Sequence, residues 1–162
     1  MNNKDYAAIV VQELTHTLTA IDEEQAEKFV ELIDEADEVF CAGAGRSGFQ
    51  VKGFAMRLMH MGVASYVVGE TCTPNIKEGG VLVVCSGSGE TKSLVNHAAK
   101  AKEMGARVAL ITINPNSSIA GMALSKSAHL HRKVQSRGIS NPFSQWDLCL
   151  NKARESSWIL LL

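Results

Sequence analysis

Two short segments rich in glycine and serine carry the residue types that bind anions. The first is Gly43-Ala44-Gly45-Arg46-Ser47-Gly48, and the second is Ser86-Gly87-Ser88-Gly89-Glu90-Thr91. Glycines let backbone N–H groups approach an anion closely, hydroxyl groups donate further hydrogen bonds, and the start of a helix adds the positive end of a dipole. Two such segments in one short chain predict a binding site for a phosphorylated small molecule.

Each segment stands where a strand is expected to pass into a helix. The run 38–42, which is apolar after Glu38, comes directly before the first segment, and the apolar run 81–85 comes directly before the second. Because the carboxyl ends of parallel strands meet at one edge of a sheet, both segments should open on the same side of the domain.

The remaining elements follow from hydrophobic periodicity. Apolar residues at helical spacing between Tyr6 and about Asp37 predict two helices, with Asp22 as N-cap of the second. Strands are then expected at 39–42, 64–68, 81–85 and 107–113, and helices at 49–61 and 92–104. After Asn114 we expect a turn or a short helix over 119–124. The alternation predicts an α/β fold, a three-layer doubly wound parallel sheet of flavodoxin-like type with N-terminal helices.

The chain length of 162 residues fits a single domain. Residues 1–37 would form its N-terminal helices, 38–130 its α/β core and 131–162 an atypical tail. The tail is polar and aperiodic as far as Pro142 and has no clean rhythm after it. The strand and helix that usually close such a sheet are therefore not evident there.

Charge and composition exclude several kinds of partner. Lysine and arginine number 16 against 17 acidic residues, and no long basic stretch occurs, so neither a nucleic acid nor a membrane surface is expected. Without a long apolar run or a signal peptide at the start, a cytoplasmic location is expected. Four well-separated cysteines, Cys41, Cys72, Cys85 and Cys149, form no Cys-x-x-Cys pair. They predict core thiols, with neither disulfides nor a metal site.

Two other interpretations of the glycine segments stay open. Residues 43–48 match the dinucleotide pattern G-x-G-x-x-G, and Glu70 follows about 20 residues later, as a ribose-binding acid would. Against this, Arg46 and Ser47 suit a terminal phosphate, and the chain is too short for two nucleotide-binding halves plus a substrate domain. Either segment could also serve only as a tight turn.

Several motifs taken together resemble one family. They lie at 42–48, 54–62, 68–70, 86–91 and 112–115. Taken in this order, these motifs resemble those of the 6-phospho-3-hexuloisomerase family, which belongs to the SIS, or sugar isomerase, superfamily. The resemblance covers about residues 5 to 130. The resemblance implies interconversion of a 3-hexulose 6-phosphate and fructose 6-phosphate through a cis-enediol, as in formaldehyde fixation by the ribulose monophosphate pathway. It also implies a homo-oligomer, commonly a tetramer, with no cofactor.

The resemblance further implies which residues meet the substrate. They are Ser47 together with Ser86, Gly87, Ser88, Gly89, Glu90 and Thr91, with Arg46 beside them. His60 is a candidate for a contact to a substrate hydroxyl or for proton handling. A packing or interface histidine is the alternative interpretation of His60.

The catalytic base is the point at which the resemblance breaks. Moving the carbonyl from C3 to C2 requires a base that removes the C2 proton. The family supplies a glutamate in a C-terminal segment similar to Ile-Gln-Pro-Met-Gly-Ser-Leu-Phe-Glu-Gln, which this chain lacks. Codons that can encode residues 143–152 read as that segment in the neighbouring frame.

We therefore hypothesise that the tail from about Ser140 is a shifted reading frame. The family glutamate is absent from this chain, and neither Asp147 nor Glu155 is expected to replace it. A binding module that recognises a sugar phosphate without transforming it is the alternative function.

Overall fold

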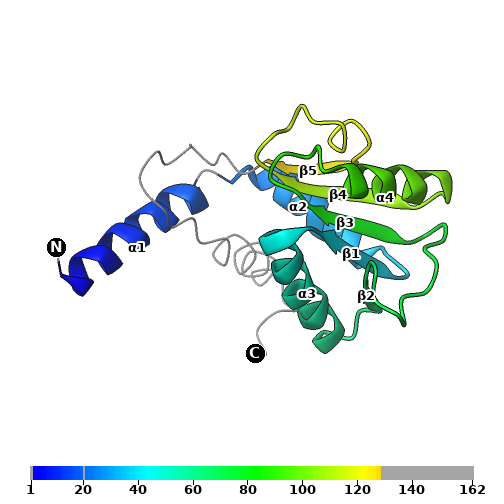
Figure 1. Ribbon diagram of the computed structural model, residues 1–162, viewed down its shortest axis with the longest axis horizontal. Helices are drawn as coiled ribbons and strands as arrows, with labels where there is room; N and C mark the ends of the chain where they lie inside the picture. The colour runs from blue at the N-terminus through cyan, green and yellow to red at the C-terminus, as the bar shows by residue number, and fades with distance from the viewer. Residues whose placement is uncertain (1, 20, 129–162) are drawn as a thin grey trace.

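The computed structural model describes residues 2–19 and 21–128 (Figure 1). The tail, with the hypothesised frame shift and with Asp147 and Glu155, lies outside the described residues.

A parallel sheet forms the centre of the described chain. Its strands are β1 (Val39–Gly43), β2 (Ser65–Val67), β3 (Val81–Cys85), β4 (Arg107–Thr112) and β5 (Ser125–Ala128). Their order in space is β2-β1-β3-β4-β5, and every neighbouring pair is parallel. This order confirms the predicted doubly wound sheet of flavodoxin-like type. The order reverses between β1 and β3, because β2 lies on one side of β1 and all later strands lie on the other.

Helices cover both faces of this sheet (Figure 1). The helices of the described chain are α1 (Asn3–Thr19), α2 (Glu23–Asp34), α3 (Gly45–His60) and α4 (Lys92–Glu103). α2 and α3 pack on one face, where the rings of Phe29 and Phe54 lie 6.3 Å apart, and α4 packs on the other. α1 projects away from the sheet. Helices were predicted in all of these regions.

Alternation along β1 explains why both faces need a helix. Val39 and Cys41 belong to the core under α2 and α3, whereas Phe40 and Ala42 belong to the core under α4. All four side chains are buried. A strand that is apolar on both faces can be stable only in the middle of a three-layer structure.

The start of α3 differs from the prediction. The helix begins at Gly45 and not at Phe49, so Arg46 and Ser47 lie in its first turn. Gly45 has φ +56°, and a Cβ on Gly43 would lie 3.0 Å from the backbone nitrogen of Gly48. These glycines let β1 pass into the helix through the single connecting residue Ala44.

Two further differences lie after β4. Residues 115–122 form a series of turns and 119–124 contain no helix, so the short helix was wrong and the alternative of a turn is confirmed. The strand β5 was not predicted, although it falls inside the expected core region. Its sequence, Ser-Lys-Ser-Ala, is short and largely polar, as is common for a strand at the edge of a sheet, so no apolar alternation marks it.

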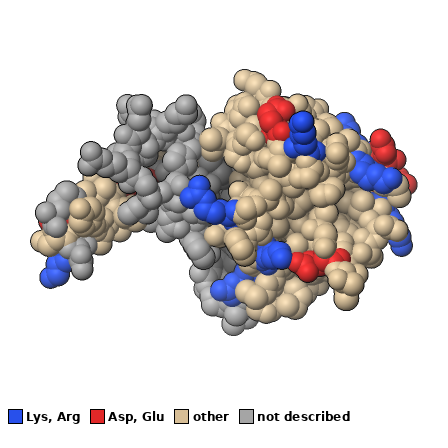
Figure 2. Space-filling view, in the orientation of Figure 1, with Lys and Arg blue, Asp and Glu red and all other residues tan. Residues whose placement is uncertain are grey.

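Within residues 2–19 and 21–128, none of the helices combines the length and the apolar character that crossing a membrane requires. The face of the protein seen in Figure 2 carries scattered lysine and arginine side chains with no continuous basic patch.

Candidate functional site: two glycine segments at the reversal of strand order

The two glycine segments meet at the carboxyl edge of the sheet. We call residues 43–48 the first loop and residues 86–91 the second loop. Gly43, at the end of β1, pairs in register with Cys85, at the end of β3. The two loops therefore leave neighbouring strands at the same level, at the position where open α/β sheets bind ligands. The side chain of Ser47 hydrogen-bonds to the thiol of Cys85, which joins the first loop to the base of the second.

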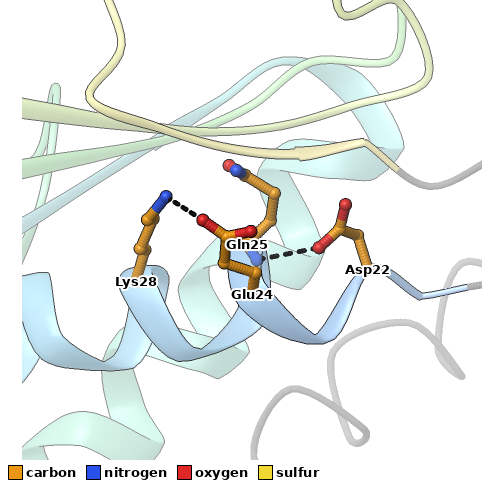
Figure 3. Close-up of polar contacts among 4 residues, drawn as sticks. All are labelled: Asp22, Glu24, Gln25 and Lys28. Carbon is orange, nitrogen blue, oxygen red and sulfur yellow. Dashed lines mark hydrogen bonds and ion pairs between the residues drawn. The ribbon is translucent and has the colours of Figure 1, made fainter.

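Each loop also delivers the start of a helix. The N-cap residues of α3 and α4 are Ala44 and Thr91, and neither provides a side-chain cap. The start of α2 is different, because the Asp22 carboxylate accepts a hydrogen bond from the N–H of Gln25 at 3.1 Å (Figure 3). The N–H groups of an uncapped first turn, together with the helix dipole, form an anion-binding site.

The carbonyl groups of the second loop are held from β4 and from the connection that follows it, residues 113–124. The carbonyl of Gly87 accepts from Thr112 Oγ1 at 3.1 Å and from the Ile113 N–H at 3.2 Å. The carbonyl of Ser88 accepts from Asn114 Nδ2 at 3.3 Å. In a trans peptide the N–H points opposite to the preceding carbonyl. The N–H of Ser88 is thereby directed away from β4 and its connection.

Serine hydroxyls shape the second loop from inside. Ser86 Oγ accepts from the N–H of Gly89 at 3.1 Å, and Ser88 Oγ accepts from the N–H of Glu90 at 3.2 Å. A hydroxyl that accepts a hydrogen bond still has its own proton to donate. Both side chains can therefore hold the loop in shape and donate to a bound anion at the same time.

Glu90 has its side chain engaged within the protein. Its carboxylate accepts from the backbone N–H of Ser118 at 2.7 Å and from Ser118 Oγ at 2.8 Å. These two hydrogen bonds hold the pKa of the Glu90 carboxyl below its ordinary value. The group is thus an anion that is already bound by two donors of the 113–124 connection.

The structure does not bring His60 to these loops within one chain. Ser47 lies in the first turn of α3, and His60 is the last residue of the same helix. At 1.5 Å per residue, the two positions are about 20 Å apart along the helix axis. The side chain of His60 is exposed.

Glu70, the acid of the dinucleotide interpretation, follows β2. Its Oε1 lies 2.5 Å from the Lys52 ammonium nitrogen, and each side chain is 55% exposed. One oxygen of the Glu70 carboxylate is therefore engaged by Lys52.

The cysteines differ in burial. Burial raises the pKa of the Cys41 thiol to about 12 and that of Cys85 to about 11, and the Ser47 hydrogen bond acts in the opposite direction on Cys85. Both are buried free thiols, as predicted, but Cys72 is exposed, so the prediction of a core thiol was wrong there. Cys149 lies outside the described residues. In the described part of the chain, no group of three or more potential ligands could hold a metal ion.

Thr112, Asn114 and Ser118, which support the second loop, were not among the residues predicted for the site. Thr112 and Asn114 belong to the motif at 112–115 that contributed to the resemblance. That motif was the available signal, but only the pairing of β3 with β4 shows that these residues contact the second loop.

The fold is a doubly wound domain whose two glycine loops form a candidate ligand site at the reversal of strand order. Residues 32–138 match the SIS domain, and the chain belongs to this family. It is 47% identical over 123 residues to 3-hexulose-6-phosphate isomerase of Bacillus subtilis, covering 76% of this chain and 66% of the relative. It is 45% identical over 116 residues to the protein of the same name from Mycobacterium gastri, covering 72% and 58%.

A solved structure agrees with these relatives. The crystal structure of a hypothetical protein from Methanococcus jannaschii, for which a molecular function of 3-hexulose-6-phosphate isomerase was inferred, superposes with a TM-score of 0.75 at 28% identity. The match covers 89% of this chain and 82% of that one. The sugar isomerase domain of an RpiR transcription factor from Sphaerobacter thermophilus shares the fold, with a TM-score of 0.72 at 22% identity. The chain spans 58% to 66% of the length of the two curated relatives named above.

Proposed function

We propose that the protein is a sugar-phosphate isomerase that interconverts a 3-hexulose 6-phosphate and fructose 6-phosphate through a cis-enediol. The observation that carries the proposal is the convergence of two uncapped helix starts and two glycine loops at one edge of the sheet. This arrangement suits a phosphate dianion, and relatives that are 47% and 45% identical to this chain carry the name of this isomerase. Formaldehyde fixation by the ribulose monophosphate pathway is the corresponding metabolic role.

The second loop would bind the phosphate group. Ser86, Ser88 and Thr91 supply hydroxyl donors, and Gly87 and Gly89 let the backbone approach closely. Thr91 is suited to this role because its side chain does not cap α4.

The first loop would act beside the second. Ser47, next to Cys85, would place a hydrogen-bonding hydroxyl at the boundary between the loops. Arg46 in the same helical turn would add positive charge. A guanidinium and a hydroxyl together suit either the phosphate or the sugar oxygens.

His60 would contribute to a site only in an assembly. We propose a homo-oligomer, a tetramer by resemblance, in which His60 of one copy approaches the loops of another. Exposed apolar side chains on and next to α3 support this proposal, since Phe49 is 76% exposed and Met56, Met59 and Met61 are also exposed. The protein would be cytoplasmic, would need no cofactor and would bind neither nucleic acid nor membrane.

The alternative is an SIS domain that binds the sugar phosphate without isomerising it. The specific observation in its favour is that residues 143–152 do not form the family segment that carries the glutamate base. Loss of a positioned base lowers the rate by a factor of about 10² to 10⁴.

A coupled assay for fructose 6-phosphate on purified protein tests the proposal, with binding measured by calorimetry on the same sample. Turnover supports the isomerase, whereas saturable binding without turnover supports the binding module. Tight binding of NAD or NADP with no binding of fructose 6-phosphate would instead establish the dinucleotide interpretation. Intact-mass measurement of the sample tests the frame shift, because the mass must equal that of the printed sequence if this tail is made.

A further inference from the structure

Glu90 is the one acidic residue in the two loops. A carboxylate next to a bound phosphate repels it, so an acid at this position requires an explanation. Its carboxylate accepts two hydrogen bonds from Ser118, at 2.7 and 2.8 Å, both shorter than the bonds inside the loop.

We infer that Glu90 is a positioning residue, which sets the conformation of the second loop through Ser118 and does not itself contact the sugar phosphate. This inference rests on the proposed sugar-phosphate site and assigns Glu90 a role different from that of the other loop residues.

The residues on either side of Ser118 show why this contact can control the loop. The N–H of Ile119 donates to the carbonyl of Gly89 at 3.3 Å, and a Cβ on Gly89 would lie 2.0 Å from Ser117 Oγ. Ser117 is 4% exposed and Ile119 is fully buried, so this part of the connection is anchored in the core. Glu90 therefore ties the end of the second loop to a fixed point, one residue before the N-cap of α4.

The position of Glu90 also determines where backbone donors point. The N–H of Glu90 donates to Ser88 Oγ, and the carbonyl on the same peptide, that of Gly89, accepts from Ile119. If the carboxylate leaves Ser118, this peptide loses part of its support, and the Ser88 hydroxyl loses a fixed orientation. The expected consequence is weaker binding of phosphate without the loss of any group that touches it.

Three substitutions separate this role from direct contact. Glu90→Ala removes both hydrogen bonds, and Ser118→Ala removes only the one from Oγ. Glu90→Gln removes the charge but keeps the geometry, because its amide oxygen accepts from the Ser118 N–H and its NH₂ donates to Ser118 Oγ. Glu24→Ala is the matched control, since Glu24 is an exposed glutamate on α2 whose carboxylate is bonded to Lys28 (Figure 3).

Dissociation constants for fructose 6-phosphate and for inorganic phosphate are measured by calorimetry on the full chain. We expect an increase of about tenfold for Glu90→Ala and about threefold for Ser118→Ala, as for hydrogen bonds to a charged group. Glu90→Gln should remain within about threefold of the unmodified protein, and Glu24→Ala should match it. In the Glu90→Ala background, Ser118→Ala should add no further weakening, because the two residues act through one contact.

Two results would overturn the inference while leaving the proposed site intact. One is unchanged binding by Glu90→Ala, and the other is Glu90→Gln binding as weakly as Glu90→Ala, which would mean that the charge itself is needed. If Glu90→Ala does not fold, Ser118→Ala and Glu90→Gln decide between the same outcomes. Absence of binding by the unmodified protein would overturn the proposed site and this inference together.

Discussion

The two glycine loops look alike in sequence but are supported in different ways. The first loop turns directly into α3 and is compact because Gly43 and Gly48 approach each other closely. The second loop is held from outside, by Thr112 at the end of β4 and by Asn114 and Ser118 in the connection that follows. The comparison teaches that one sequence signature can describe a helix start that is rigid by its own geometry or a loop that depends on a distant segment.

The largest difference that we expect between the two loops is in the loss of unfolding free energy when one glycine of each loop is replaced by alanine. Gly89 and Gly45 both have positive φ, but a Cβ on Gly89 would meet Ser117, whereas nothing lies within 4 Å of one on Gly45. Gly45→Ala should cost only the left-handed backbone penalty, about 1 kcal/mol. Gly89→Ala should cost about 3 kcal/mol or more, because it adds overpacking against a buried residue. Urea unfolding of both variants measures this difference, and equal losses would show that the two loops are equally constrained.

A smaller effect on stability and binding is expected when a hydrogen bond that supports the second loop is removed. Thr112→Val is nearly isosteric but removes the bond to the Gly87 carbonyl and the bond accepted from the Asn114 N–H. We expect about 1 to 3 kcal/mol lower unfolding free energy and weaker binding of fructose 6-phosphate. Thr15→Val is the control, because Thr15 is exposed on α1 and its hydroxyl bonds only to the preceding helical turn. Equal binding by both variants would show that the Gly87 carbonyl needs no support.

The two loops should also differ in how their stability depends on pH, which acid unfolding measures, because the second loop contains a carboxylate, that of Glu90, and the first contains none. The folded-state pKa of Glu90 lies below its value in the unfolded chain, so its bonds stabilise the fold above about pH 4.3. That stabilisation is lost as the pH falls through the folded-state pKa. The stability difference between the unmodified protein and Glu90→Ala should therefore shrink as the pH falls below about 4.3. A difference that stays constant over this range would contradict the assigned cause.

The smallest effect is expected in the reactivity of Cys85, whose thiol is hydrogen-bonded to Ser47 where the two loops meet. Because burial raises the pKa of the Cys85 thiol to about 11 and the Ser47 bond opposes that rise, Ser47→Ala should raise the pKa further and slow alkylation of Cys85. Among the three cysteines in the part of the chain that the structure describes, the exposed Cys72 should react first at pH 8, with Cys41 and Cys85 much slower. Peptide mapping after timed alkylation measures each cysteine separately. Faster reaction of Cys85 in Ser47→Ala would mean that the serine acts mainly by shielding the thiol.

Much of the fold was predictable, because its central strands are apolar and are followed by glycine-rich segments. The uniformly apolar β3 and the glycines after β1 and β3 indicate buried parallel strands that pass into helices. β5 was not predictable, because Ser125–Ala128 is polar and becomes a strand only by pairing with β4. The start of α3 was also missed, since the approach of Gly43 to Gly48 cannot be read from residue types.

The candidate site, like the fold, has features that the sequence predicts and features that it does not. Hydroxyls and glycines in the two loops predict an anion site from local chemistry alone, and Asp22 predicts its own helix cap for the same reason. The bonds of Glu90 to Ser118 and of Asn114 to Ser88 join residues far apart in the chain. No local pattern specifies such contacts.

By itself, then, the sequence determined the class of fold, the positions of both loops and the kind of ligand they suit, because these depend on periodicity and on residue type. Tertiary structure alone decided that Gly43 and Cys85 stand side by side, that the carboxylate of Glu90 bonds to Ser118, and that His60 lies at the far end of α3 from the loops. The physical reason is that strand order and register bring together groups whose separation along the chain carries no information about their distance in space.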